Sequence, residues 1–199
     1  MKIGLYGGTF SPPHLGHVRA ARCFIQGVGL DKLIVMPAGI PPHKIVDFPI
    51  PPEHRLKLVQ LAFDGIGEVS EYEMNKDGAS YTYLTLRWLK EQYPFDEIYL
   101  CMGEDMFLSF EKWREFKEIF DGCSIVCLRR ENTGGDEIFA KNELYKKSYG
   151  ANTLILSYEP LVVSSTEIRE LAEKKESIEH LVPKTVADYI SINGLYNRG

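Results

Sequence analysis

Short apolar runs alternate along this chain with longer segments in which apolar residues recur at helical spacing. Apolar runs bounded by turn residues predict strands, and the amphipathic segments between them predict the helices that connect parallel strands. The predicted strands are Lys2–Tyr6, Lys32–Met36, Val69–Glu73, Glu97–Met102, Ser124–Leu128 and Thr153–Ser157. The alternation therefore indicates an α/β fold with a Rossmann-like, doubly wound parallel sheet covered by helices.

The pattern of elements is that of one domain over residues 1–199. We expect the apolar stripes of the helices over Glu53–Phe63 and from Ser80 onward to face the core. Residues 131–152 should form a surface loop and a short helix. The stretch 164–199 is expected to be a small helical section at the carboxyl end of the same domain.

Composition agrees with a single soluble domain. The chain has 199 residues, of which 44% are hydrophobic and 26% charged, so it can bury a good core. No apolar run approaches membrane-spanning length, and the first residues lack the basic-then-apolar pattern of a signal peptide, so we expect a cytoplasmic protein that does not bind a membrane. The net charge of -5 argues against broad binding to nucleic acid. Any anion site must therefore be local.

The four cysteines show neither a CxxC pair nor the spacing of a zinc site. They are Cys23, Cys101, Cys123 and Cys127. Most of them lie in apolar runs that predict strands, which favours buried free thiols over metal ligands.

The stretch from Gly7 to His17, which reads GGTFSPPHLGH, carries the most chemistry. It follows the first apolar run, and paired glycines at a strand end let the backbone turn tightly and approach a ligand. The N-terminus of the helix predicted next offers free N–H groups to an anion. His14 and His17 are three residues apart and should share one helix face, which Gly16 leaves uncrowded. Two imidazoles beside free N–H groups favour a polyphosphate site, although such a strand, loop and helix is also ordinary packing.

The same stretch resembles the T/HxGH signature of the nucleotidylyltransferase superfamily. In its longer form, GGTFxPPHLGH, it is similar to the bacterial nicotinate-nucleotide adenylyltransferases. The resemblance implies contacts with ATP from Gly8, Thr9, Phe10, His14 and His17. Family members usually have Asp where this chain has Ser11, so a carboxylate contact made at that position would be missing.

A second candidate anion site follows the last predicted strand. Ser164 and Glu167 have the S-x-x-E spacing of a capping box, so a helix should begin there. The neighbouring hydroxyls and the guanidinium of Arg169 supply more donors than a cap requires. The segment resembles the family's SSTxIR motif, which binds the triphosphate. The resemblance implies ATP contacts from Ser164, Ser165, Thr166 and Arg169.

Parts of a second substrate site lie between these two motifs. Pro37–Lys44 follows the second predicted strand, at the sheet edge where ligands of open α/β sheets bind. Its prolines stiffen a loop that ends in Lys44. The matching PPHK segment of the family contacts substrate phosphate, and a solvated surface lysine is the alternative.

Ser80–Leu86 looks like the family's SYTxDTL segment, with two departures. Leu84 replaces the Asp, which puts a carboxylate role there in doubt, and Lys76 stands where Arg is usual. The mononucleotide contacts that remain are expected from Tyr81, Thr82 and Thr85.

Gly103–Met106 and the later Lys112–Trp113 resemble the family's GxDM…KW block. The Asp105 carboxylate, just after a predicted strand, either offsets a helix dipole or accepts hydrogen bonds from ribose hydroxyls of ATP beside Gly103, as the resemblance implies. Trp113 belongs either to the core or to the mononucleotide site, where an indole face would stack on an electron-poor pyridine ring. We expect the stacking role.

Other nucleotide-dependent classes lack their motifs in this sequence. It has no G-x-x-x-x-G-K-[ST], no complete dinucleotide fingerprint and no G-x-S-x-G elbow, which argues against P-loop enzymes, NAD-dependent dehydrogenases and serine hydrolases. The family resemblance covers nearly the whole chain and is weakest in residues 131–152.

We therefore expect direct in-line transfer of AMP from ATP to nicotinate mononucleotide, which gives deamido-NAD and pyrophosphate. His14, His17 and Arg169 would be catalytic, because such chemistry asks mainly for positioning and for stabilisation of charge on the phosphates. No carboxylate cluster has metal-ligand spacing, so Mg²⁺ would be held mainly by ATP phosphates. Transfer to nicotinamide mononucleotide or phosphopantetheine, and a non-catalytic nucleotide sensor, are the alternatives. The sequence leaves open whether the chain forms a homo-oligomer.

Overall fold

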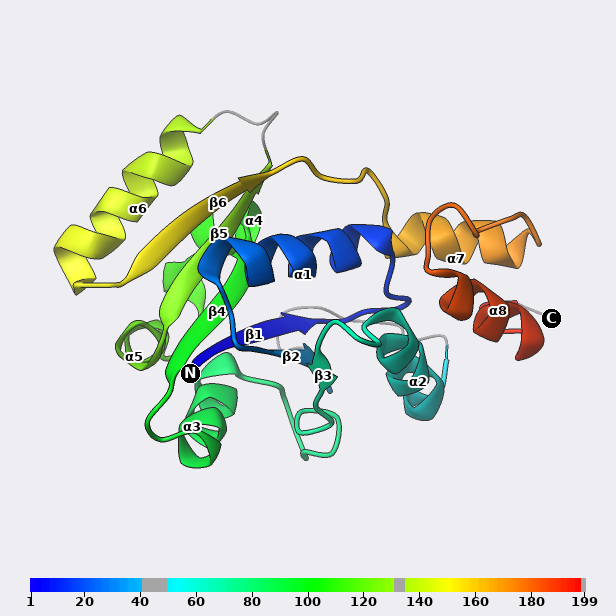
Figure 1. Ribbon diagram of the computed structural model, residues 1–199, viewed down its shortest axis with the longest axis horizontal. Coiled ribbons are helices and arrows are strands. Elements are labelled where there is room, and N and C mark those ends of the chain that lie inside the picture. The colour runs from blue at the N-terminus through cyan, green and yellow to red at the C-terminus, as the bar shows by residue number, and fades with distance from the viewer. Residues whose placement is uncertain (41–49, 131–134, 198–199) are drawn as a thin grey trace.

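Six parallel strands form one sheet in the order β3-β2-β1-β4-β5-β6 (Figure 1). The computed structural model describes residues 1–40, 50–130 and 135–197. The strands are β1 Lys2–Gly8, β2 Lys32–Pro37, β3 Glu68–Val69, β4 Glu97–Gly103, β5 Ser124–Arg130 and β6 Thr153–Tyr158. The predicted Rossmann-like, doubly wound parallel sheet is thereby confirmed.

Helices cover both faces of this sheet. They are α1 Leu15–Val28, α2 Pro52–Ala62, α3 Thr82–Gln92, α4 Glu104–Leu108, α5 Phe116–Gly122, α6 Asp136–Tyr149, α7 Ser165–Glu173 and α8 Lys184–Ile192, with a short 3₁₀ helix η1 at Phe110–Lys112. Side chains of α1, α2, α7 and α8 share one core cluster, and those of α3 to α6 share the other. The carboxyl-terminal helices therefore pack into the same core as α1.

Alternation along the strands explains the two cores. In β2, Leu33 and Val35 point into one cluster, whereas Ile34 and Met36 point into the other. A parallel strand covered on both faces is apolar at every position, and this one reads as a continuous apolar run.

Two elements differ from the sequence prediction. The strand expected over Val69–Glu73 ends at Val69, because the chain turns away from the sheet and the Tyr72 ring stacks on Trp88 with centroids 4.3 Å apart. The helix expected to be short within 131–152 has 14 residues. The helix ends as many helices do, because the glycine that follows it, Gly150, has a left-handed backbone.

The strand order reverses between β1 and β4, which places a switch point there. In open α/β sheets the crevice outside the carboxyl ends of such strands receives ligands. Gly7 and Gly8 end β1, and Gly103 ends β4, at this edge. Within the described ranges, no helix is long and apolar enough to cross a membrane.

Candidate active site

Two adjoining cavities open at the carboxyl ends of the central strands. The first cavity, of about 480 Å³, lies over the ends of β1, β2 and β4 and reaches the start of α3 and the segment after η1. The second cavity, of about 770 Å³, lies between the start of α1 and the start of α7. The residues that line both are Tyr6, Thr9, His17 and Gly103. Two ligands could therefore meet beside His17.

The loop after β1 is shaped by the ring of Phe10. That ring is buried and lies edge-on to Phe63 and to the imidazole of His17, with centroids 5.5 and 5.1 Å away. A Cβ on Gly8 would come within 2.7 Å of the same ring, so glycine is needed there. Phe10 itself has a positive φ of 45°, is buried and lines none of the three cavities. Gly8 and Thr9 line the first cavity, and the Phe10 side chain belongs to the core.

His14 and His17 form a reciprocal cap at the start of α1. His14 is the N-cap residue with an extended backbone, so the expectation that both lie on the helix is corrected: only His17 does. The backbone N–H of His17 donates to Nδ1 of His14 at 3.3 Å, and that of His14 donates to Nδ1 of His17 at 3.2 Å. The two rings stack with centroids 3.6 Å apart. The geometry is that of a capping box with imidazoles in place of hydroxyl and carboxylate.

The cap also determines the protonation of both rings. Because each Nδ1 accepts a hydrogen bond, the single proton of each neutral imidazole is on Nε2. Burial lowers the pKa of His14 from 6.5 to about 4. Burial, and then the charge of His14, lowers the pKa of His17 to about 3. Both residues are therefore neutral Nε2–H donors near pH 7.

A side chain at Gly16 would crowd the same arrangement. A Cβ at this position would lie 3.0 Å from Nδ1 of His14 and 3.0 Å from a methyl of Val163, in the segment that leads to α7. The absence of a side chain thus lets the α7 segment approach the histidine pair closely, as the uncrowded face in the sequence suggested.

Helix α7 begins as predicted and is tied to the loop after β1. The Ser164 hydroxyl accepts from the backbone N–H of Glu167 at 3.1 Å, which forms the cap. The Ser165 hydroxyl donates to the carbonyl of Pro12 at 2.8 Å, and Arg169 donates to the carbonyl of Ser11 at 2.7 Å. At the position where the family has Asp, it is thus the backbone of Ser11 that contacts Arg169.

The second cavity has a cationic lining. Ser164, Ser165, Thr166 and Arg169 of the α7 segment line it opposite His14 and His17. Among the described residues around it, the charged ones are Arg169 and Arg130, and none is acidic. Such a lining favours an anion with several oxygens. A smaller third cavity of about 120 Å³ shares Gly103, Arg130 and Tyr158 with the second and is lined by Asp105.

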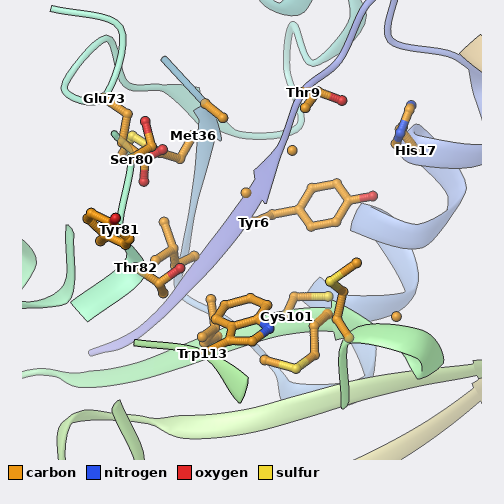
Figure 2. Close-up of a pocket in the computed structure, with 18 of the residues that line it drawn as sticks. Tyr6, Thr9, His17, Met36, Glu73, Ser80, Tyr81, Thr82, Cys101 and Trp113 are labelled. Carbon is orange, nitrogen blue, oxygen red and sulfur yellow. The ribbon is translucent and has the colours of Figure 1, made fainter. Parts of the chain in front are cut away.

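The first cavity has an aromatic and an acidic side. Figure 2 shows Tyr81, Thr82 and Trp113 on the side away from His17, with Glu73 and Ser80 above Tyr81. The Trp113 ring is half-buried and packs on Phe110 with centroids 5.0 Å apart, so one part of it belongs to the core and another faces the cavity.

Thr85 is not among the residues that line the first cavity. It is buried, and its hydroxyl donates to the Glu73 carboxylate at 2.6 Å. Burial raises the pKa of Glu73, against hydrogen bonds from Thr85 and Ser80. Gly39 lies against Glu73, because a Cβ there would be 2.2 Å from the Glu73 carbonyl oxygen. Thr85 therefore positions Glu73, and Glu73 faces the cavity in its place.

Sequence reasoning missed several residues that line the cavities. Lys44 lies outside the described residues. Glu73 and Arg114 line the first cavity, and Tyr158 and Arg130 line the second, although none belongs to a matched motif position. Arg130 ends β5 and Tyr158 ends β6 at the sheet edge. Their positions at strand ends were the signal that could have found them.

Comparison with known proteins gives consistent matches. A family model described as cytidylyltransferase-like matches residues 5–171. The probable nicotinate-nucleotide adenylyltransferase of Geobacter metallireducens is 36% identical, over 98% of this chain and 98% of its own. That of Clostridium perfringens is 34% identical, over 99% of this chain and 98% of its own. A solved structure titled Plasmodium falciparum nicotinic acid mononucleotide adenylyltransferase complexed with NaAD has a TM-score of 0.74 at 18% identity, over 98% and 97% of the two chains, which shows the shared fold.

Proposed function

The chain belongs to the nicotinate-nucleotide adenylyltransferases of the cytidylyltransferase-like family, and we propose that it transfers AMP from ATP to nicotinate mononucleotide in NAD biosynthesis. The resemblance found in the sequence is confirmed by these relatives. The reaction releases pyrophosphate and gives deamido-NAD.

One observation carries the proposal: His17 lines both cavities, at the point where they adjoin. We assign the triphosphate to the second cavity, which has a cationic lining and the α7 donors, and the ribose and base to its continuation beside Asp105. We assign the mononucleotide to the first cavity, with its pyridine ring against Trp113 and its polar contacts from Tyr81 and Thr82. The two phosphates would then meet beside the Nε2–H of His17.

The chemistry follows as a single displacement. An oxygen of the mononucleotide 5′-phosphate forms a bond to the α-phosphorus of ATP, while the bond from that phosphorus to the bridging oxygen of the β-phosphate breaks and pyrophosphate leaves. His14 and His17 would each donate from Nε2 to phosphate oxygens as charge moves onto the bridging oxygen. Such fixed donors need no reorganisation during the reaction. Arg169, held by Ser11 and Thr166, would bind the leaving phosphates.

Nucleotidyltransferases of this kind generally use Mg²⁺ with ATP. The described residues include no group of three or more His, Cys, Asp or Glu side chains that could hold a metal ion. We therefore assign Mg²⁺ to the phosphates of the nucleotide and to water, and we give no protein residue a metal-binding role.

Release of pyrophosphate tests the proposal. The purified protein is mixed with ATP and Mg²⁺, and with nicotinate mononucleotide, nicotinamide mononucleotide or phosphopantetheine in separate reactions. We expect the highest kcat/KM with nicotinate mononucleotide, together with formation of deamido-NAD. Pyrophosphate release only with another acceptor would change the substrate, and ATP binding without release for any acceptor would favour a sensor.

A further inference from the structure

We propose that the guanidinium of Arg114 recognises the carboxylate of the pyridine substrate and so makes this enzyme prefer the acid over the amide. The inference rests on the proposed function, because it concerns the same first cavity. Arg114 lines that cavity and directly follows Trp113, on which we place the pyridine ring.

The position of Arg114 is held by its neighbours. Its Cζ atom lies 5.0 Å from the centroid of the Tyr81 ring and 6.0 Å from that of Tyr83, so the guanidinium stacks against two aromatic faces at the start of α3. Arg114 also hydrogen-bonds with Tyr81. A guanidinium has five N–H donors in a fixed fork, so the others can still bind a planar anion in a way that an ammonium group could not match. Glu115, the next residue, has a left-handed backbone with φ 54°, and this turn carries the chain from η1 into α5.

The geometry of the substrate fits this position. The acid or amide group of the pyridine is coplanar with the ring and projects from its edge. A ring stacked on Trp113 can therefore extend this group toward the neighbouring residues Arg114 and Tyr81, which lie against each other. Figure 2 shows Tyr81, Thr82 and Trp113 on the same side of the cavity, away from His17, beside which we place the phosphates.

The charges around the first cavity make a cation favourable for binding an acidic ligand. Its described lining includes two charged side chains, Glu73 and Arg114, together with the neutral His17. The Glu73 carboxylate would repel a nicotinate ring and would have no such effect on nicotinamide. A carboxylate enters favourably only if a positive group compensates for this repulsion, and Arg114 is the lining residue of that sign.

The start of α3 adds to the same preference. Tyr81, the N-cap residue, makes no side-chain cap, and the first turn contains no acidic residue, since Leu84 stands where the family has Asp. The helix dipole at this end is therefore not offset by a local carboxylate. A ligand carboxylate near Tyr81 and Arg114 would be favoured by both groups.

Arg87 provides a matched control. Its guanidinium also stacks on Tyr83, with Cζ 5.1 Å from the ring centroid, but it is paired through two nitrogens with Glu118 and does not line the cavity. A loss of stacking or of surface charge should therefore affect Arg87→Gln and Arg114→Gln alike. Only the second should alter the choice of pyridine.

The experiment measures kcat/KM for both mononucleotides in wild type, Arg114→Gln, Arg114→Lys and Arg87→Gln. We expect Arg114→Gln to lower the value for nicotinate mononucleotide by about 10- to 100-fold, the range for loss of a charge-assisted hydrogen bond, and to leave nicotinamide mononucleotide within about twofold. Arg114→Lys should recover part of the loss. Arg87→Gln should match wild type with both substrates.

Two results would overturn the inference. An unchanged ratio between the two substrates means that Arg114 only stacks, and an equal loss on both means that it contacts the phosphate or ribose that they share. Calorimetric titration with deamido-NAD and NAD gives an independent readout, in which wild type and Arg87→Gln should bind the acid form more tightly and Arg114→Gln should not. If wild type transfers AMP to neither mononucleotide, the proposed function fails, and the titration still decides the role of Arg114.

Discussion

His14 and His17 each accept, at Nδ1, the backbone N–H of the other, and their rings stack at 3.6 Å. A single structural unit thus begins helix α1 and fixes the tautomer of both rings, which line the second cavity. Protonation at either Nδ1 would remove one of the cap hydrogen bonds, which agrees with the low pKa values of both residues.

The first prediction is that stability falls between about pH 6.5 and pH 4 because of this pair. In the unfolded chain each histidine takes up a proton near pH 6.5, whereas in the folded protein the pKa values are about 4 and about 3. The unfolded state therefore binds more protons in this window, and acidification favours it. At pH 5 this effect lowers the free energy of unfolding by at most about 2 kcal/mol for each histidine. The loss disappears again above pH 6.5.

Urea unfolding at pH 7 and pH 5 measures this effect. The variant His14→Asn/His17→Gln keeps hydrogen-bonding side chains and does not titrate in the window, so its loss of unfolding free energy between the two pH values should be smaller than that of wild type by about 2 to 4 kcal/mol. Equal losses in both proteins would mean that the two histidines titrate normally.

The second prediction concerns catalysis by His17. His17→Ala should lower kcat roughly a hundredfold or more, about 3 kcal/mol by analogy with oxyanion donors, and should change the KM for the mononucleotide little. The reason is that His17 lies where the two cavities adjoin and donates to charge that grows in the transition state. The exposed His180, which lines none of the three cavities, serves as the control, and His180→Ala should match wild type. A near-normal kcat for His17→Ala contradicts the mechanism.

The third prediction concerns the shape of Arg169. Two of its nitrogens already donate, to the Ser11 carbonyl at 2.7 Å and to the Thr166 hydroxyl at 3.2 Å, which holds the guanidinium over the second cavity. Arg169→Lys keeps the charge but cannot make these contacts and bind phosphate together. We expect a clearly raised KM for ATP and a lower kcat.

The exposed Arg19, paired with Glu159 at 2.8 Å, is the matched control for that substitution. Arg19→Lys should leave both kinetic constants unchanged. If Arg169→Lys also equals wild type, Arg169 only anchors the start of α7 to the loop after β1.

The sequence predicted those parts of the fold and of the site that depend on local pattern. Alternating apolar runs indicated the sheet, and the S-x-x-E spacing placed the start of α7 correctly. The strand at Val69 was predicted too long, because the stacking of Tyr72 on Trp88 is a tertiary contact without a signal in strand periodicity.

The sequence predicted the orientation of individual side chains less well. Thr85 reads as a polar contact for the substrate, but it faces Glu73, since a buried carboxylate needs a donor. The spacing predicted that His14 lies in the helix, but it is the N-cap residue of α1. For Thr85 the partner, Glu73, lies 12 residues away in another segment, and spacing within the motif carries no information about it. For His14 the partner, His17, was in the motif, but the spacing of three fits both a shared helix face and a reciprocal cap.

The last prediction tests where the pyridine ring binds. Trp113 is half-buried between Phe110 and the first cavity, whereas Trp88 stacks on Tyr72 and lines neither of the two large cavities. Trp113→Ala should raise the KM for nicotinate mononucleotide through a stacking loss on the order of 1 to 2 kcal/mol and leave the KM for ATP nearly unchanged, and Trp113→Phe should recover part of the loss. Trp88→Phe should change neither KM. If Trp113→Ala lowers the melting temperature while both KM values stay constant, Trp113 acts only in the core, and the ring must bind nearer to Tyr81 and Thr82.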